Sequence, residues 1–164
     1  MRRNDREITD INEKIKLIEQ NKVCRIGFSD NGQPYIVPMN YGFTFESGVL
    51  VIYLHCAKEG RKIDILKNNN KVCFEIDDDH RLVDGGEIAC KYGYSYSSII
   101  GFGKIELINE PGEKTQILNI LMKHQTGKDT VYSYTEKELD GVTTLKIIVD
   151  DFSGKRRVHP SAIS

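Results

Sequence analysis

The chain has 164 residues, of which 39% are hydrophobic and 29% are charged, a composition ordinary for a globular protein. This length favours a single domain over residues 1–164, and a chain of this size buries roughly 70% of its unfolded surface. The 23 Lys and Arg residues nearly balance 24 Asp and Glu residues, which leaves a net charge of -1. General nucleic-acid binding and membrane-surface binding need a basic excess, so we expect neither.

The N-terminus and the cysteines bear on the compartment. The opening residues "MRRNDREITD" lack the apolar core of a signal peptide, and no stretch approaches the length of a transmembrane helix. The cysteines are scattered, with no C-x-x-C pair and no pairing with histidine at zinc spacing. We therefore expect free thiols, a cytoplasmic location and no metal site. The cysteines are Cys24, Cys56, Cys73 and Cys90.

The first third of the chain predicts a helix followed by three strands. Asp10 resembles a helix cap, and isoleucines at helical spacing predict a helix over about 10–20. "KVCRIGF" alternates apolar and polar residues, and the turn signal "SDNG" joins it to "PYIVPMNYGF" in a hairpin. "ESG" turns the chain again into the apolar strand "VLVIYL". We expect these three strands to form an antiparallel meander.

The rest of the chain adds three more strands and two helices. "RKIDILKNN" predicts a short helix, and "NEPGEKTQILNILMKHQ" predicts a longer one with Pro111 near its first turn. The strands expected are "KVCFEID", "YSYSSIIGFGKIELI" and "VTTLKIIVD", with a polar loop over about 78–86 and a basic tail over about 151–164. Six strands with short turns and few helices favour a mainly β fold, an antiparallel barrel.

A cluster of cations lies where the third strand meets the short helix. "HCAKEGRKID" places Lys58, Arg61 and Lys62 at this junction, with His55 at the end of the strand. A phosphate monoester is bound by two or more cations with backbone donors, and Arg can bind it through two hydrogen bonds. A solvated helix end explains the same residues equally well. The junction therefore indicates either a phosphate site or an exposed helix start.

Two other segments carry binding features. Pro34 and Pro38 make "PYIVPMNYGF" an edge or irregular strand, so backbone groups of residues 37–41 are free to bond a flat heterocycle. An ordinary barrel edge has the same pattern. Further on, tyrosines alternate with Ser95 and Ser97, which places aromatic rings and hydroxyl groups on opposite faces of a strand. The other histidines, His80, His124 and His159, are isolated among polar residues and are expected at the surface.

These segments in this order resemble the pyridoxamine 5′-phosphate oxidase-like flavoproteins, in particular the branch that contains nitroimidazole-resistance proteins. The resemblance runs over nearly the whole chain, through "PYIVPMNYGF", "IYLHCAKEGRKID", "KVCFEID", "SYSSIIGFGKIE" and "SGK". It implies a six-stranded antiparallel split β-barrel that forms a homodimer and binds FMN in two clefts at the dimer interface.

The resemblance also implies a set of FMN-binding residues. Arg61 and Lys62 match the cations that meet the FMN phosphate, and Lys155 is a candidate to reach the site from the C-terminal segment, either of the same chain or of the partner subunit. The implied ring and phosphate contacts are, in chain order, Val37, Pro38, Met39, Asn40, His55, Cys56, Ala57, Ser95, Ser97 and Ser98. Which serine hydroxyl points toward the cofactor stays open.

Three functions are compatible with these residues and with the resemblance. The first is an FMN-dependent oxidoreductase that reduces a small electron acceptor such as a nitroaromatic, with the cofactor supplying the redox chemistry. The second is a non-enzymatic FMN or haem binding or sensor protein, with His55 or His124 as haem ligand, and the third is a barrel without a cofactor. Pyridoxamine phosphate oxidation itself is not expected, because there is no second anion cluster and no Trp, and only Arg157 and His159 echo a substrate contact.

Overall fold

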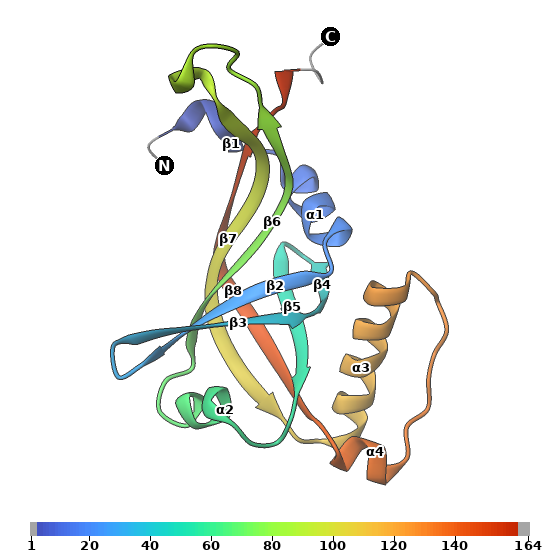
Figure 1. Cartoon of the computed structure of the whole chain (residues 1–164). Helices are drawn as coiled ribbons and strands as arrows, with labels where there is room; N and C mark the ends of the chain where they lie inside the picture. The colour runs from blue at the N-terminus through green and yellow to red at the C-terminus, as the bar shows by residue number, and fades with distance from the viewer. Residues whose placement is uncertain (1–2, 161–164) are drawn as a thin grey trace.

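The computed structural model describes residues 3–160, and these form one antiparallel sheet of eight strands with helices beside it (Figure 1). The strands are β1 (Glu7–Ile8), β2 (Val23–Asp30), β3 (Gln33–Asn40), β4 (Gly42–Glu46), β5 (Val49–Cys56), β6 (Lys71–Val83), β7 (Gly93–Ile108) and β8 (Thr143–Arg157). The helices are α1 (Ile11–Gln20), α2 (Arg61–Leu66), α3 (Pro111–Thr126) and α4 (Glu136–Asp140), with 3-10 turns at Asn4–Arg6 and Ala89–Lys91.

The sheet has the order β3-β2-β6-β7-β8-β5-β4, and β1 pairs with β8 beside this path. It is not closed, since β3 and β4 are its two ends. The predicted class, a mainly β antiparallel fold of the split-barrel type, is confirmed. The strand number is eight rather than six, because the residues expected as one strand over 34–43 divide at Tyr41 and because Glu7–Ile8 adds a short strand.

The predicted hairpin of β2 and β3 is present. The prediction that β5 follows β3 in a three-stranded meander is wrong. β3 pairs only with β2, whereas β5 pairs with β4 and β8 at the other end of the sheet. The cause is a corner at Tyr41, which is fully buried and donates its hydroxyl to the Ile18 carbonyl. The next residue is glycine for a steric reason: a Cβ atom on Gly42 would lie 2.9 Å from the backbone of Ile120 in α3.

The basic tail predicted over 151–164 is wrong as far as Arg157. β8 continues through this segment, paired with β7 as far as Arg157, and Gly154 and Lys155 also pair with β1, so its backbone groups have partners within the sheet. Residues 161–164 of the predicted tail lie outside the described part of the chain. The polar loop expected from residue 78 is also mostly strand: β6 runs to Val83 with an irregularity between Asp78 and Arg81.

The core fills the inside of the curled sheet, and two helices cover it. α1 is the predicted N-terminal helix; Asp10 accepts a hydrogen bond from the Asn12 backbone N–H, and the helix buries Leu17 and Ile18. α3 packs a smaller apolar cluster around Ile117 against the other end of the sheet.

Within residues 3–160, no helix has both the length and the apolar character that a membrane span requires. All four cysteines are free, as predicted.

Candidate functional site

A cavity of about 270 Å³ lies where the end of β3 approaches the end of β5, and we refer to it as the β3–β5 cavity. Its position follows from the topology: β3 is one end of the open sheet, and the Tyr41 corner carries the chain across to β4 and β5 at the other end. Every residue that lines it belongs to the set predicted from the sequence. These residues are Val37, Pro38, Met39, Asn40, His55, Cys56, Ala57 and Lys62.

The β3 side of the cavity is an edge strand. β3 pairs with β2 alone, so the backbone groups along its other edge are not used within the described sheet, as the two prolines suggested. Its last residue is held in place: Asn40 donates from Nδ2 to the Lys22 carbonyl (3.1 Å) and to Oε1 of Gln125 (3.2 Å). The cavity wall thus combines unpaired backbone with one fixed side-chain amide.

The β5 side contributes a thiol that stays protonated. Cys56 is half-buried, and burial raises the pKa of its thiol while the nearby Lys62 ammonium partly opposes this rise. A neutral thiol is a weak nucleophile, because the thiolate is the reactive form. His55 beside it is exposed at the cavity rim. The cavity therefore offers a cation and hydrogen-bonding groups rather than an activated nucleophile.

Arg61, the other predicted phosphate ligand, does not line the cavity. Gly60 adopts φ +126°, which favours glycine, just before α2 begins. The Arg61 side chain is directed to the β2–β3 hairpin: its Nε lies 3.2 Å from Oδ2 of Asp30 and its guanidinium carbon lies 4.5 Å from the centre of the Tyr35 ring. Since this side chain is 52% exposed, the Asp30 contact is open to competition by an anion.

The predicted serines and Lys155 lie elsewhere, on β7 and β8. The first part of β7 and the last part of β8 are near the top of Figure 1, and α2 is at the bottom. Ser95 and Ser97 are buried: the Ser95 hydroxyl donates to the Asp79 carbonyl (2.8 Å), and the Ser97 hydroxyl accepts from Nε of Arg156 (3.1 Å).

Ser98 and Lys155 are direct cross-strand neighbours on the opposite, outer face of the sheet. We call this surface the serine face and define it by Ser98, Ile100, Phe102 and Lys155. Ser98, Ile100 and Phe102 follow at every second position of β7, so they share one side of the strand. Ser98 is therefore the only one of the three predicted serines on the outer face. A single chain does not bring the serine face and the β3–β5 cavity together.

Two site residues were not found from the sequence. Gln125 in α3 orients Asn40 across 85 residues of chain, and Asp30 at the end of β2 holds Arg61 across 31 residues. Neither contact has a local sequence signal, because each depends on how distant elements pack. His124, expected at the surface, is half-buried: its ring lies 4.7 Å from the Tyr41 ring, and its Nε2 is 2.7 Å from the Asn21 carbonyl.

No cluster of three or more His, Cys, Asp or Glu side chains that could hold a metal ion occurs among residues 3–160. In the haem ligand candidate His124, Nε2 is already bonded to a backbone carbonyl and the ring packs against Tyr41 and Phe43, so within the described residues Nδ1 is its one unengaged ring nitrogen. His55 remains accessible.

Comparison with solved structures finds the same fold in several proteins. A candidate 5-nitroimidazole antibiotic resistance protein from Bacteroides thetaiotaomicron is 36% identical, with a TM-score of 0.78 over 92% of this chain and 86% of that chain. The flavocytochrome Anf3 from Azotobacter vinelandii is 18% identical, with a TM-score of 0.79 over 98% and 73% of the two chains. The FAD and heme binding protein from Mycobacterium smegmatis is also 18% identical, with a TM-score of 0.79 over 94% and 75%.

At 18% identity the last two likenesses concern the fold alone. None of the curated protein sequences matches this chain. Residues 10–156, which include all eight residues of the β3–β5 cavity and the serine face, match the family described as pyridoxamine 5′-phosphate oxidase. The match covers far more than half of the chain and, together with the 36% identical relative, shows that the protein belongs to the pyridoxamine 5′-phosphate oxidase family.

Proposed function

We propose that this protein is an FMN-dependent oxidoreductase that reduces a small electron acceptor. The observation that carries the proposal is the β3–β5 cavity, in which eight flavin-site residues implied by the family resemblance, from β3, from α2 and from the end of β5 and the residue after it, line one space. A cation, a free strand edge and a fixed amide in that space are the groups that a phosphorylated flavin requires. The cytosol is the proposed location, because four free thiols suit a reducing compartment.

The residues of the chain have distinct roles in this proposal. Lys62 in the cavity wall binds the FMN phosphate, and Arg61 joins it by exchanging its exposed Asp30 contact for the phosphate. The free edge of β3 and the Asn40 amide bind the polar edge of the flavin ring. Bound FMN supplies the transfer of electrons to the acceptor. The protein binds and orients it, and Cys56 takes no part as a nucleophile because its thiol is protonated.

The proposal includes a second copy of the chain. Ligand sites commonly have volumes of about 300–1,000 Å³, so the cavity of about 270 Å³ in one chain is small for FMN. The serine face carries two predicted FMN residues, Ser98 and Lys155, beside Ile100 (44% exposed) and Phe102 (56% exposed). A homodimer that covers these apolar residues would bring the serine face of one protomer to the cavity of its partner.

A nitroaromatic compound is the acceptor we propose first. Its support is the 36% identical relative, whose description concerns 5-nitroimidazole resistance. Bound FMN in its reduced state would supply the electrons for such an electrophile, and the residues of the β3–β5 cavity would hold and orient it. Turnover of a nitroimidazole with chemically reduced FMN, absent in the FMN-free protein, is the result expected.

Visible absorption of the purified protein tests the cofactor. Flavin bands, with FMN released on denaturation, are expected; a Soret band would instead support a haem protein, and a colourless protein that does not bind added FMN would contradict both. The double variant Arg61→Ala/Lys62→Ala should weaken FMN binding by at least about tenfold, since a hydrogen bond to a charged group contributes roughly 1.5–3 kcal/mol.

Lys67→Ala is the matched control for this double variant. Lys67 directly follows α2, is exposed and pairs with Asp64 outside the cavity. Its loss should leave FMN affinity unchanged. If the double variant, the control and the unaltered protein bind FMN with equal affinity, Arg61 and Lys62 do not bind the FMN phosphate.

A further inference from the structure

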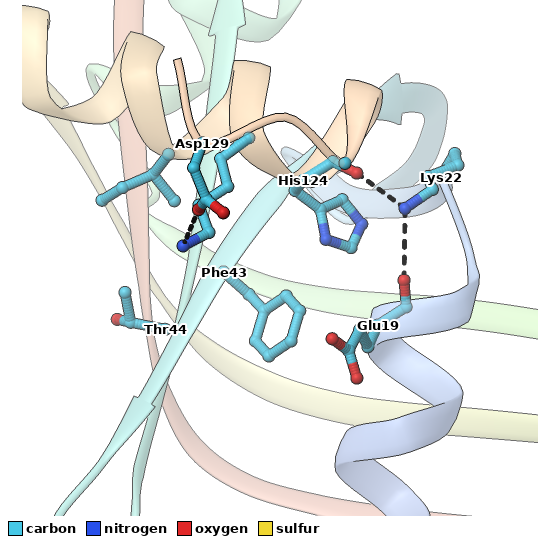
Figure 2. Close-up of a pocket in the computed structure, with 9 residues that line it drawn as sticks. Glu19, Lys22, Phe43, Thr44, His124 and Asp129 are labelled. Carbon is cyan, nitrogen blue, oxygen red and sulfur yellow. Dashed lines mark hydrogen bonds and ion pairs between the residues drawn. The ribbon is translucent and has the colours of Figure 1, made fainter. Parts of the chain in front are cut away.

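A second and larger cavity, of about 460 Å³, lies between α3, the end of α1 and β4, and we refer to it as the α3 cavity. It is separate from the β3–β5 cavity, with which it shares no lining residue. Figure 2 shows it with its lining side chains, which are Glu19, Lys22, Phe43, Thr44, Ile120, Lys123, His124, Gly127 and Asp129. None of these residues has a part in the proposed flavin site.

One wall of the α3 cavity is aromatic. The rings of Phe43 and His124 meet edge to face, 5.3 Å between centres, and the Tyr41 ring packs 4.7 Å behind His124. Both lining rings are half-buried and face the same space in Figure 2. Rings fixed in this way offer a flat surface on which another planar ring can stack.

Both cations of the cavity are already engaged. Lys22 donates to the Glu19 carbonyl (3.3 Å) and to the His124 carbonyl (2.6 Å), so its ammonium lies at the C-terminal ends of α1 and α3, where a positive charge is favourable (Figure 2). Lys123 pairs with Asp129 at 2.6 Å. Lys123 is thus neutralised by an acid, whereas Lys22 is held in place by two backbone carbonyls.

The unused polar atoms of the cavity are hydrogen-bond acceptors. His124 is 2.7 Å from the Asn21 carbonyl through Nε2, so Nε2 carries the proton and Nδ1 keeps its lone pair. Burial lowers the pKa of His124, which keeps the imidazole neutral at pH 7. Among residues 3–160, no hydrogen bond or ion pair engages the Glu19 carboxylate or Nδ1 of His124. Glu19 also lies in the last turn of α1, where a negative charge is unfavourable without a donor.

We propose that the α3 cavity binds a small planar aromatic molecule that carries N–H donors, of the amino-substituted azaheterocycle class. Its ring stacks on Phe43, and its N–H groups donate to the Glu19 carboxylate and to Nδ1 of His124. The volume suits this class, since small-molecule cavities begin at about 300 Å³.

The test titrates 2-aminobenzimidazole into the full-length protein saturated with FMN, followed by calorimetry and by amide chemical shifts. We expect saturable binding with shifts at Phe43, Thr44 and Gly127. The probe 1-methylbenzimidazole has the same ring system without N–H groups and should bind at least about tenfold more weakly, as loss of a charge-assisted hydrogen bond requires.

Variants assign the binding to the cavity. Glu19→Ala should weaken 2-aminobenzimidazole binding by about tenfold or more, and Phe43→Leu by about 2- to 10-fold through lost stacking. Glu46→Ala is the matched control, because Glu46 is an exposed acid on the same strand as Phe43 and lies outside the cavity. FMN affinity should stay unchanged in all three variants.

Four results would overturn the proposal. They are an absence of probe binding, equal binding of the methylated probe, unchanged affinity in Glu19→Ala, and chemical shifts confined to the β3–β5 cavity. Glu19 is exposed and its carboxylate has no described partner, so Glu19→Ala should fold even where Phe43→Leu does not.

Discussion

The β3–β5 cavity and the serine face contain most of the predicted FMN residues, and they present their side chains differently. In the cavity, eight residues from three elements surround one space, and Asn40 is fixed by a distant helix. On β7, two of the three serines are turned inward and already bonded to the protein, which leaves Ser98 and Lys155 on an exposed, partly apolar face. The cavity is a concave pocket, and the serine face is a surface suited to contact another molecule.

In the proposed function, one chain therefore contains two parts of the FMN site that it does not join by itself. Long antiparallel strands separate them: β7 has 16 residues and β8 has 15, so residues at one end of the sheet are remote from those at the other. A two-fold axis can bring such parts together in trans, because each protomer offers the same two surfaces. Substitutions in each region should show whether the two act together.

The largest effect is expected from a charge on the serine face. Phe102→Glu should convert the proposed dimer to a monomer and weaken FMN binding by about 100-fold or more, because a carboxylate would replace a ring in the proposed interface. Phe102 is 56% exposed in the single chain, so the variant should still fold. Light scattering after size-exclusion chromatography and an FMN titration measure the two results.

Val131→Glu is the control for this substitution, since Val131 is 83% exposed and far from β7 in the chain. It should leave both mass and FMN affinity unchanged. A Phe102→Glu protein that remains dimeric would place the interface elsewhere and separate the serine face from the flavin site.

A mixed dimer gives a direct test of the two regions acting in trans. Lys62→Ala and Lys155→Ala should each weaken FMN binding by roughly tenfold in the homodimers. Co-expressed under two tags, they form a mixed dimer with one site that has both lysines and one that has neither. About one FMN should therefore bind per mixed dimer with full affinity. If both lysines served the same cavity in cis, no site of full affinity would be recovered.

Substitution of Ser98 should affect mainly FMN affinity, whereas substitution of Ser97 should affect mainly the free energy of unfolding. Ser98→Ala should reduce FMN affinity by about 3- to 10-fold and leave the free energy of unfolding nearly unchanged, because its side chain is on the outer face. Ser97→Ala should lower the free energy of unfolding by about 1 kcal/mol, because Arg156 then loses an acceptor inside the fold, and should leave FMN affinity unchanged. Chemical denaturation and FMN titration of both variants give this comparison; the reverse pattern would contradict it.

Local patterns in the sequence predicted much of the fold. The α1 helix and the β2–β3 hairpin follow from side-chain periodicity and from the turn at Asn31 and Gly32, both of which adopt positive φ. The strand order could not be predicted this way. β5 pairs with β8 across about 90 residues, and that choice depends on how the sheet curls around its core.

The extension of β8 was missed because its residues are charged. Lys155 to Arg157 indicate a solvated tail by composition, yet they alternate between the two faces of a strand that β7 and β1 hold by backbone hydrogen bonds. Side-chain charge does not oppose pairing where the charged groups reach solvent. The residues of the β3–β5 cavity were identified through the family resemblance, whereas the Arg61–Asp30 contact required the packed structure.

The smallest effect concerns pH and begins at the α3 cavity, which His124 lines. Burial lowers the pKa of His124 below its ordinary value of 6.5, so the unfolded chain takes up a proton that the folded chain does not. Stability should therefore fall as the pH drops through 6.5 toward the folded-state pKa, with a slope below about 1.4 kcal/mol per pH unit.

His124→Gln keeps a donor for the Asn21 carbonyl and should remove this slope. Amide exchange should show the loss first near Tyr41, against which His124 packs, and later at Ser95 and Ser97. Identical slopes in the two proteins would assign the pH dependence to another group.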